Sequence, residues 1–226
     1  MEEKIVYFED WKPENTDITF QLVKERARNR GIKKIVMAST TGATARKALD
    51  FFGPDGFKLV IVPHQYGFRE VNRFPLELVD ALEEAGHKVH FGTMLFHTEN
   101  LYGNDTPQAL ANLLRCFSQG FKVLFEIVMM ATDAGLLNPG ERVIAVAGRA
   151  RGSDTAAVMQ AASSRTPRNL RVNEIICKPL DPLNIDELRK RLEGGGVRRR
   201  PNALTNKTLS LCSDGLQFQD ALGGES

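Results

Sequence analysis

The feature that most constrains the fold is the alternation of short apolar runs with amphipathic helical segments along most of the chain. The extended runs span residues 34–38, 58–62 and 142–147, and each is almost continuously apolar after its first residue. Such runs are typical of parallel strands, because helices cover both faces of a parallel sheet. The segments between them carry apolar residues three and four positions apart. This pattern predicts a layered α/β domain with a mostly parallel sheet.

The same pattern predicts the remaining elements and one domain boundary. We expect helices over about residues 15–30, 43–52, 75–85 and 106–136, with Asn15 as the first cap and Gly120 interrupting the longest, and further strands over residues 4–8, 88–91 and 172–177. Asn184 and Glu187 have the spacing of a capping box before a short terminal helix. We expect one domain over residues 1–193 and a largely disordered tail over residues 194–226, which begins with three glycines and an arginine triplet.

Charge and composition argue against several classes of protein. The 30 basic and 28 acidic side chains leave a net charge of only +2, whereas proteins that follow a nucleic-acid backbone concentrate basic residues. The apolar runs are far shorter than the roughly 20 residues that span a bilayer, and the first residues lack the pattern of a secretion signal. Cys116, Cys177 and Cys212 lack the paired spacing of a zinc site. We therefore expect a cytoplasmic protein without a metal, a nucleic-acid partner or a membrane partner.

The loop after the strand over residues 34–38 is the strongest local signal for a ligand. It contains the hydroxyl residues Ser39, Thr40, Thr41 and Thr44 together with Gly42. A helix start exposes backbone N–H groups and a partial positive charge, so it can receive a phosphate group. The hydroxyls would add hydrogen-bond donors, and the glycine would let the backbone approach the ligand. The alternative is that Thr40 or Thr41 only caps the helix.

A second loop with similar chemistry follows the strand over residues 142–147. It contains Gly148, Arg149, Arg151, Gly152 and Ser153. Arginine binds phosphate through two parallel hydrogen bonds, and ligands of parallel sheets gather at the carboxyl ends of the strands. The alternative is that the two arginines are solvated or pair with the neighbouring Asp154.

The loop after the strand over residues 58–62 would form a third wall of the same cleft. Tyr66 and Phe68 could stack on a flat ring, and His64 could donate a hydrogen bond, although each could equally pack in the core. Glu126 and Asp133, seven residues apart on the longest predicted helix, share a face. An ion pair or a surface position is favoured for them over an acid–base pair. The pattern identifies no catalytic residues, so it does not decide whether the chain is an enzyme.

Two of these loops resemble parts of the C-terminal α/β domain of pyruvate kinase. Residues 35–45 are similar to a strand followed by the Ser-Gly-Arg-Ser-Ala turn of that domain, and residues 146–153 are similar to its Thr-Gly-Trp-Arg-Pro-Gly-Ser-Gly loop. In many pyruvate kinases these loops hold the activator fructose 1,6-bisphosphate. Ala43 stands where that turn has arginine, and Arg149 stands where that loop has tryptophan, so recognition of the bisphosphate is not implied. The catalytic β/α barrel needs about 250 residues and does not fit in this chain.

The chain is also similar to a family of separate archaeal and bacterial proteins built from that domain. The similarity runs from Val6-Tyr7-Phe8 and Pro13-Glu14-Asn15-Thr16, through residues 64–68, to Glu174-Ile175-Ile176-Cys177-Lys178-Pro179. It implies a three-layer α/β/α sandwich whose mostly parallel sheet has the strand order 3-2-1-4-5 and one antiparallel edge strand. It also implies flavin mononucleotide (FMN) as a cofactor in the cleft between the loops.

The sequence thus supports one main hypothesis and two alternatives. The main hypothesis is a binding domain for a phosphorylated small molecule, with FMN as the expected ligand and without pyruvate kinase activity. The alternatives are an FMN-dependent oxidoreductase and a ligand-free protein-interaction subunit. A homo-oligomer is compatible with all three.

Overall fold

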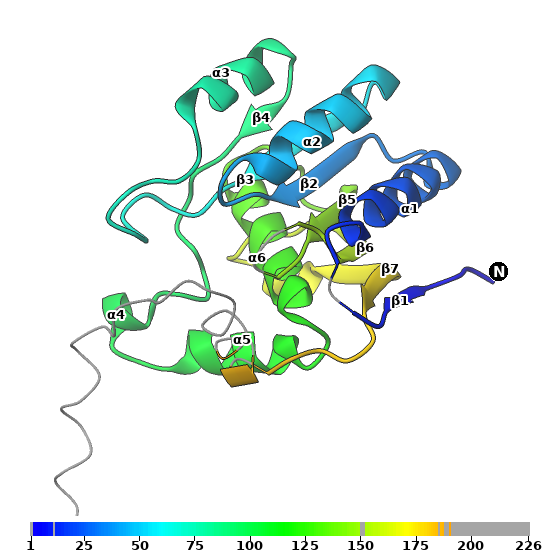
Figure 1. The fold of residues 1–226 in the computed structure, drawn as a ribbon. Coiled ribbons are helices and arrows are strands. Elements are labelled where there is room, and N and C mark those ends of the chain that lie inside the picture. The colour runs from blue at the N-terminus through cyan, green and yellow to red at the C-terminus, as the bar shows by residue number, and fades with distance from the viewer. Residues whose placement is uncertain (1, 11, 150–151, 185, 188–189, 191–226) are drawn as a thin grey trace, which may run out of the picture. The chain divides into compact units, whose positions relative to one another are not determined.

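One seven-stranded sheet organises the described part of the chain (Figure 1). The computed structural model describes residues 2–10, 12–149, 152–184, 186–187 and 190, and the expected tail over residues 194–226 lies outside them. The strands are β1 Val6–Phe8, β2 Lys34–Ala38, β3 Lys58–Val62, β4 Lys88–Val89, β5 Arg142–Ala147, β6 Thr155–Gln160 and β7 Arg171–Pro179. Their order across the sheet is β1-β7-β6-β5-β2-β3-β4. Of these strands, β6 alone runs antiparallel to its neighbours.

The expected strand order describes the inner part of this sheet but not its edge. The five strands β4-β3-β2-β5-β6 follow the order 3-2-1-4-5. Beyond β6, however, β7 and β1 continue the sheet, so the antiparallel strand is internal and not at the edge as expected. The strand β6 was not predicted, because it directly follows the loop with Gly148 and Gly152 and its alanines have low strand propensity.

Helices cover both faces of the sheet, which gives the three-layer α/β/α class that was predicted (Figure 1). The helices are α1 Asn15–Arg30, α2 Ala43–Phe52, α3 Leu76–Glu84, α4 Glu99–Tyr102, α5 Thr106–Arg115 and α6 Gln119–Asp133. Neighbouring residues of β2 point to opposite layers. Ile35 and Met37 belong to the cluster that contains Phe20 of α1, whereas Val36 belongs to the cluster that contains Leu124 of α6.

Two predicted helix boundaries were wrong. Asn15 is the first residue of α1 and not its cap, since Glu14 holds the cap position and the Asn15 side chain donates to the Asp10 carbonyl (2.8 Å). The long helix predicted over residues 106–136 is two helices. It divides before α6 because Ser118 Oγ accepts a hydrogen bond from Phe121 N (2.9 Å) and caps a new helix start.

Glycine at position 120 lets α6 approach the sheet closely. Gly120 lies in the first turn of α6 and not at the break in the predicted helix. A Cβ atom at this position would overlap the Thr155 side chain at the start of β6. The first turn of α6 therefore lies directly against β6.

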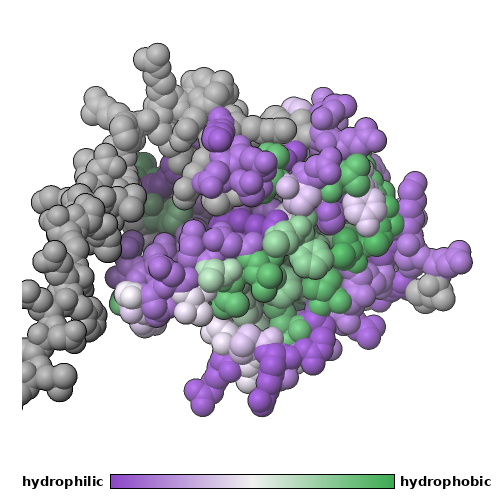
Figure 2. Space-filling view, turned by 90° about the horizontal axis from the view of Figure 1, so that it is seen from below, coloured by the Kyte–Doolittle hydropathy of each residue, from purple (hydrophilic) through white to green (hydrophobic). Residues whose placement is uncertain are grey.

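The helices α4 and α5 expose several large apolar side chains. Figure 2 shows the molecule from below, the side on which α4 and α5 lie in Figure 1, and apolar residues form a patch on that face. The exposed large apolar residues of these helices and the following turn are Leu101, Tyr102, Leu110, Leu113 and Phe117. Within the described residues, no helix combines the length and the apolar character needed to cross a membrane.

Candidate functional site

The structure brings the three predicted loops to one edge of the sheet. β2 pairs in parallel with both β3 and β5, with Val36 opposite Val60 and Ile35 opposite Ile144. The carboxyl ends of these three strands therefore meet, and the loops that begin at Ser39, His64 and Gly148 leave the sheet side by side. Ligands of parallel sheets bind at this edge.

The first loop caps α2 and contacts the loop after β3. Ser39 is buried, and its Oγ accepts a hydrogen bond from Ala45 N (3.2 Å), so Ser39 has the capping role that was considered for Thr40 or Thr41. Thr40 Oγ1 lies 3.2 Å from His64 Nε2. Thr41 is exposed and Thr44 is half-buried. The backbone N–H groups of Ala43 and Thr44 have no partner within the helix, as at every helix start.

Gly42 is required for packing as well as for the turn. Its backbone is left-handed (φ 82°), and a Cβ atom would lie 2.7 Å from Leu78 Cδ2 and 2.9 Å from Pro75 Cδ. The glycine therefore lets α2 start against α3. Substitution of Gly42 changes the fold locally, so it is a poor probe of ligand binding by itself.

We expect Gly42→Ala to destabilise the protein by about 2 kcal/mol, from the left-handed backbone together with the overlap with Leu78 and Pro75. Gly31→Ala is the matched control, because Gly31 is also left-handed (φ 63°) but has no atom within 4 Å of the added Cβ. Gly31→Ala should lower the free energy of unfolding by only about 1 kcal/mol. Urea unfolding measures both values, and equal losses would show that the contact with α3 is unimportant.

The second loop is a tight turn that packs on α1. A Cβ atom on Gly148 would lie 2.5 Å from the Gly152 carbonyl oxygen, so only glycine permits this turn. Ser153 N donates to Thr16 Oγ1 (3.0 Å), and Thr19 Oγ1 donates to the Ser153 carbonyl (3.2 Å). The Ser153 hydroxyl is buried without a hydrogen-bond partner among the described residues. Arg151, the other predicted anion ligand of this loop, lies outside the described residues.

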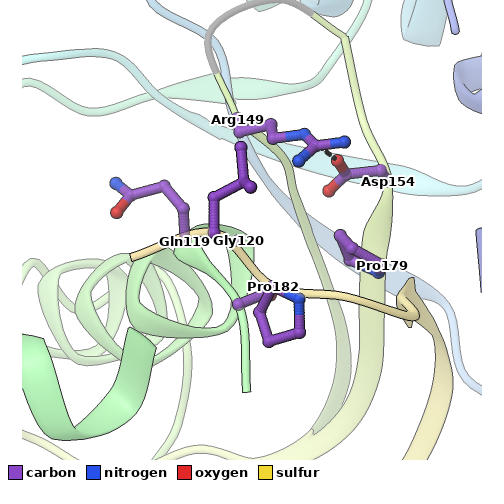
Figure 3. Close-up of a pocket in the computed structure, with 8 residues that line it drawn as sticks. Gln119, Gly120, Arg149, Asp154, Pro179 and Pro182 are labelled. Atoms are coloured by element: carbon purple, nitrogen blue, oxygen red, sulfur yellow. Dashed lines mark ion pairs between the residues drawn. The ribbon is translucent and has the colours of Figure 1, made fainter. Parts of the chain in front are cut away.

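Arg149 is paired with Asp154, the alternative that the sequence analysis kept open. Arg149 Nε lies 3.5 Å from Asp154 Oδ2, and both side chains are almost buried. Burial raises the pKa of Asp154, against the hydrogen bond from Thr155 Oγ1 and the charge of Arg149, which both lower it. The pair faces a small pocket at the start of α6, where Figure 3 shows the two side chains pointing toward each other above Gly120 and Pro182. The other lining residues are Ser118, Gln119, Pro179 and Leu183.

The third loop forms a small, open hollow with Thr40 at its edge. We call it the β3 hollow, and its lining consists of Thr40, His64, Gln65, Gly67, Phe68, Arg69, Val71, Asn72 and Arg73. Tyr66 is not among the lining residues, since it is exposed and its ring contacts that of Phe91 (centroids 4.8 Å apart). The hollow thus combines a hydroxyl group, an imidazole and two guanidinium groups.

His64 is the most unusual group in the β3 hollow. Its Nδ1 atom is buried and has no hydrogen-bond partner among the described residues. Burial first, and then the positive charge of Arg69, lower its pKa from 6.5 to about 4. His64 is therefore neutral at pH 7, and its Nδ1 is available to a ligand or a water molecule.

A buried charged cluster beside this hollow was not predicted as a unit. Lys122 and Glu126 of α6 are 1% and 3% exposed, and Lys122 Nζ lies 2.5 Å from Glu126 Oε2. The same Nζ lies 3.1 Å from His97 Nε2, while Glu126 Oε1 accepts a hydrogen bond from Phe96 N (2.9 Å). Burial lowers the pKa of Lys122, against the attraction of Glu126. Burial and the charge of Lys122 lower the pKa of His97.

The ion pair that was favoured for Glu126 is confirmed, whereas Asp133 accepts a hydrogen bond from Ser164 N (2.8 Å) and lies apart from the cluster. The spacing of four residues between Lys122 and Glu126 indicates an ion pair on one helix. The sequence does not indicate the contact with His97, because His97 lies in a loop 25 residues away.

The described residues give no sign of a metal centre or of a reactive thiol in the core. Within the described ranges, no group of three or more His, Cys, Asp or Glu side chains could hold a metal ion. Burial raises the pKa of the Cys177 thiol to about 12, and its Sγ contacts Thr19 Oγ1 (3.7 Å). Cys177 therefore belongs to the core, whereas Cys116 is exposed.

The fold is that of an α/β domain, and the polar loops after β2, β3 and β5 form a candidate small-molecule site at the carboxyl edge of the sheet. The family model described as pyruvate kinase, alpha/beta domain, matches residues 17–160. The chain belongs to this family.

Solved structures similar to this chain include two of pyruvate kinase from Cryptosporidium parvum. The complex of that enzyme with ADP is 17% identical, with 69% of this chain and 25% of that chain covered and a TM-score of 0.37. A second structure of the enzyme is 16% identical, with 68% and 24% covered and a TM-score of 0.36. This chain matches about a quarter of the length of those enzymes.

Proposed function

We propose that this protein binds a phosphorylated small molecule at the carboxyl edge of β2 and β3, with FMN as the expected ligand. One observation carries the proposal. Thr40 lies in the loop that leads into α2, and it also lines the β3 hollow, which contains His64, Arg69 and Arg73. A helix start, a hydroxyl group and two guanidinium groups are the donors that bind a phosphate group.

The charges around the hollow also favour an anion. The charges of Arg69 and Lys122 act on His64 in the direction that lowers its pKa, and Glu126 acts in the opposite direction. Arg69 and Arg73 line the hollow, so both arginines lie where they can contact an anionic ligand. The choice of FMN rests on the family resemblance of the sequence, and the hollow adds the imidazole of His64, whose Nδ1 has no hydrogen-bond partner among the described residues.

We expect purified protein to bind FMN, and Arg73→Ala to weaken the affinity about ten-fold through loss of one charge-assisted hydrogen bond. Quenching of flavin fluorescence measures the affinity. Riboflavin, which lacks the phosphate group, should bind more weakly than FMN to the wild type. Equal binding of FMN and riboflavin would contradict a phosphate site.

Arg165→Ala is the control for loss of one positive charge. Arg165 is exposed and follows β6. The end of β6 pairs with the start of β5, so Arg165 follows the edge of the sheet that is opposite to the β3 hollow. Its replacement should leave the affinity for FMN unchanged. An equal loss in both variants would mean that only overall charge matters.

One observation favours the alternative of an FMN-dependent oxidoreductase. The cluster of Lys122, Glu126 and His97 lies close enough to His64 for each of its charges to shift the pKa of His64. Charged and proton-holding groups beside a bound flavin can tune its electronics for hydride transfer. Anaerobic bleaching of bound FMN by a reduced nicotinamide would favour the enzyme, and unchanged absorbance would favour binding alone.

A further inference from the structure

Phe68 occupies a position between two imidazole rings in the β3 hollow. Its ring centroid lies 4.8 Å from that of His64 at an interplanar angle of 75°, and 5.3 Å from that of His97 at 73°. Both contacts are edge-to-face, the favourable arrangement for aromatic pairs. One flat ring, that of Phe68, therefore contacts both histidines.

The two histidines are held in place independently of Phe68. His97 Nε2 lies 3.1 Å from Lys122 Nζ, and His64 Nε2 lies 3.2 Å from Thr40 Oγ1. Because an ammonium group only donates, His97 Nε2 is the acceptor, and the proton of the neutral ring lies on Nδ1. His97 thus offers an N–H donor, and His64 offers the Nδ1 atom that lacks a partner. Phe68 satisfies neither group, because its ring has no hydrogen-bonding atom.

The segment that carries Phe68 is fixed at its ends and exposed in its middle. Gln65 Oε1 accepts a hydrogen bond from Met94 N (2.7 Å), and Asn72 Oδ1 accepts one from Phe74 N (3.2 Å). Between these points, residues 66, 67, 69, 70 and 71 are exposed. The segment between β3 and α3 contains no helix or strand, and long loops of this kind often close over ligands. Phe68 can therefore leave its position without disruption of the sheet.

We infer that the space between His64 and His97 is a binding slot for a planar heteroaromatic ring, and that Phe68 fills the slot in the absence of a ligand. A ring with hydrogen-bonding edges would displace Phe68 and pair with the two imidazoles. The inference rests on the proposed function for the phosphate end of the ligand, but the slot can be tested without a phosphate group. In this proposal, Phe68 competes with the ligand ring for the slot and does not stack on that ring.

The test measures the affinities of wild type, Phe68→Ala and Phe68→Leu for FMN and for lumichrome, a flavin ring without ribityl or phosphate groups. If Phe68 occupies the slot most of the time, the Phe68→Ala protein should bind both probes about ten-fold more tightly than the wild type, because no side chain has to leave the slot before a probe binds. Phe68→Leu, which retains an apolar side chain, should show a smaller rise and serves if Phe68→Ala fails to fold. Leu76→Ala is the control for apolar truncation, since Leu76 is exposed and outside the hollow; its affinity should not change.

Two results would overturn the slot. One is weaker binding of both probes by the Phe68 variants, because Phe68 would then be a stacking wall. The other is failure of lumichrome to bind the folded Phe68→Ala protein. Tight lumichrome binding together with equal affinities for FMN and riboflavin would support the slot and refute only the phosphate site.

Discussion

Replacement of Glu126 by leucine should destabilise the protein by about 3–5 kcal/mol, the largest effect that we expect from a single substitution. Removal of one member of a buried ion pair leaves the other charge without compensation. Here Lys122 is 1% exposed and would keep only His97 as a hydrogen-bond partner, and Phe96 N would lose its acceptor. Urea unfolding followed by circular dichroism measures the loss.

The double variant Lys122→Met, Glu126→Gln is the matched control. Methionine has a similar volume to the lysine stem, and glutamine can still accept the hydrogen bond from Phe96 N. Removal of both charges should return the stability to within about 1 kcal/mol of the wild type, because replacement of a buried pair is often close to neutral. If the single Glu126→Leu variant lost less than about 1 kcal/mol, the pair would be solvated in solution and the description of a buried cluster would be wrong.

Acid should destabilise the protein well before its carboxylates titrate, and His64 should account for much of the effect. The pKa of His64 is about 4 in the folded state and 6.5 in the unfolded chain. Between these values the unfolded chain binds more protons than the native protein, so the free energy of unfolding falls as the pH falls. Above pH 6.5, His64 causes no loss of stability. As the pH falls, protonation of His64 in the unfolded chain lowers the free energy of unfolding by about 2 kcal/mol at pH 5 and by at most about 3 kcal/mol at pH 4.

Burial of His64 sets the sign of this prediction, and most of the charged groups that face it act in the same direction. Arg69, Lys122 and His97 oppose its protonation, and Glu126 alone favours it. His64→Gln should flatten the pH dependence between pH 7 and pH 5, because glutamine keeps a polar atom near Thr40 Oγ1 but does not titrate. A smaller slope should remain, since the pKa of His97 is also lowered. An unchanged slope in the variant would refute the assignment to His64.

The parts of the fold that were predicted are those whose signals are local in sequence. The apolar runs of β2, β3 and β5 and the end of α1 at Gly31 are confirmed. The capping box of Asn184 and Glu187 is also present, with both backbone N–H groups bonded to the opposite side chain (2.9 Å each). Each of these features depends on a few neighbouring residues, which a single sequence displays.

The parts that were missed depend on contacts between distant residues. The strand β6 has a weak propensity of its own and is fixed by β5 on one side and β7 on the other. The division before α6 depends on Ser118, whose Oγ also lies 3.2 Å from Thr155 Oγ1. The contact between His97 and Lys122 and the position of Phe68 between two histidines are set by the tertiary structure. The sequence could indicate which loops meet, but not which side chains face one another.

The internal position of β6 has a consequence for how this family can diversify. The loop over residues 148–154 leaves the sheet in β5 and re-enters it directly in β6, so hydrogen-bonded strands restrain both of its ends. The loop after β3 leaves the sheet in a strand but returns through α3, and it has no such restraint at its far end. Insertions and substitutions that change ligand preference should therefore accumulate in residues 65–73, while the loop over residues 148–154 keeps its length among relatives.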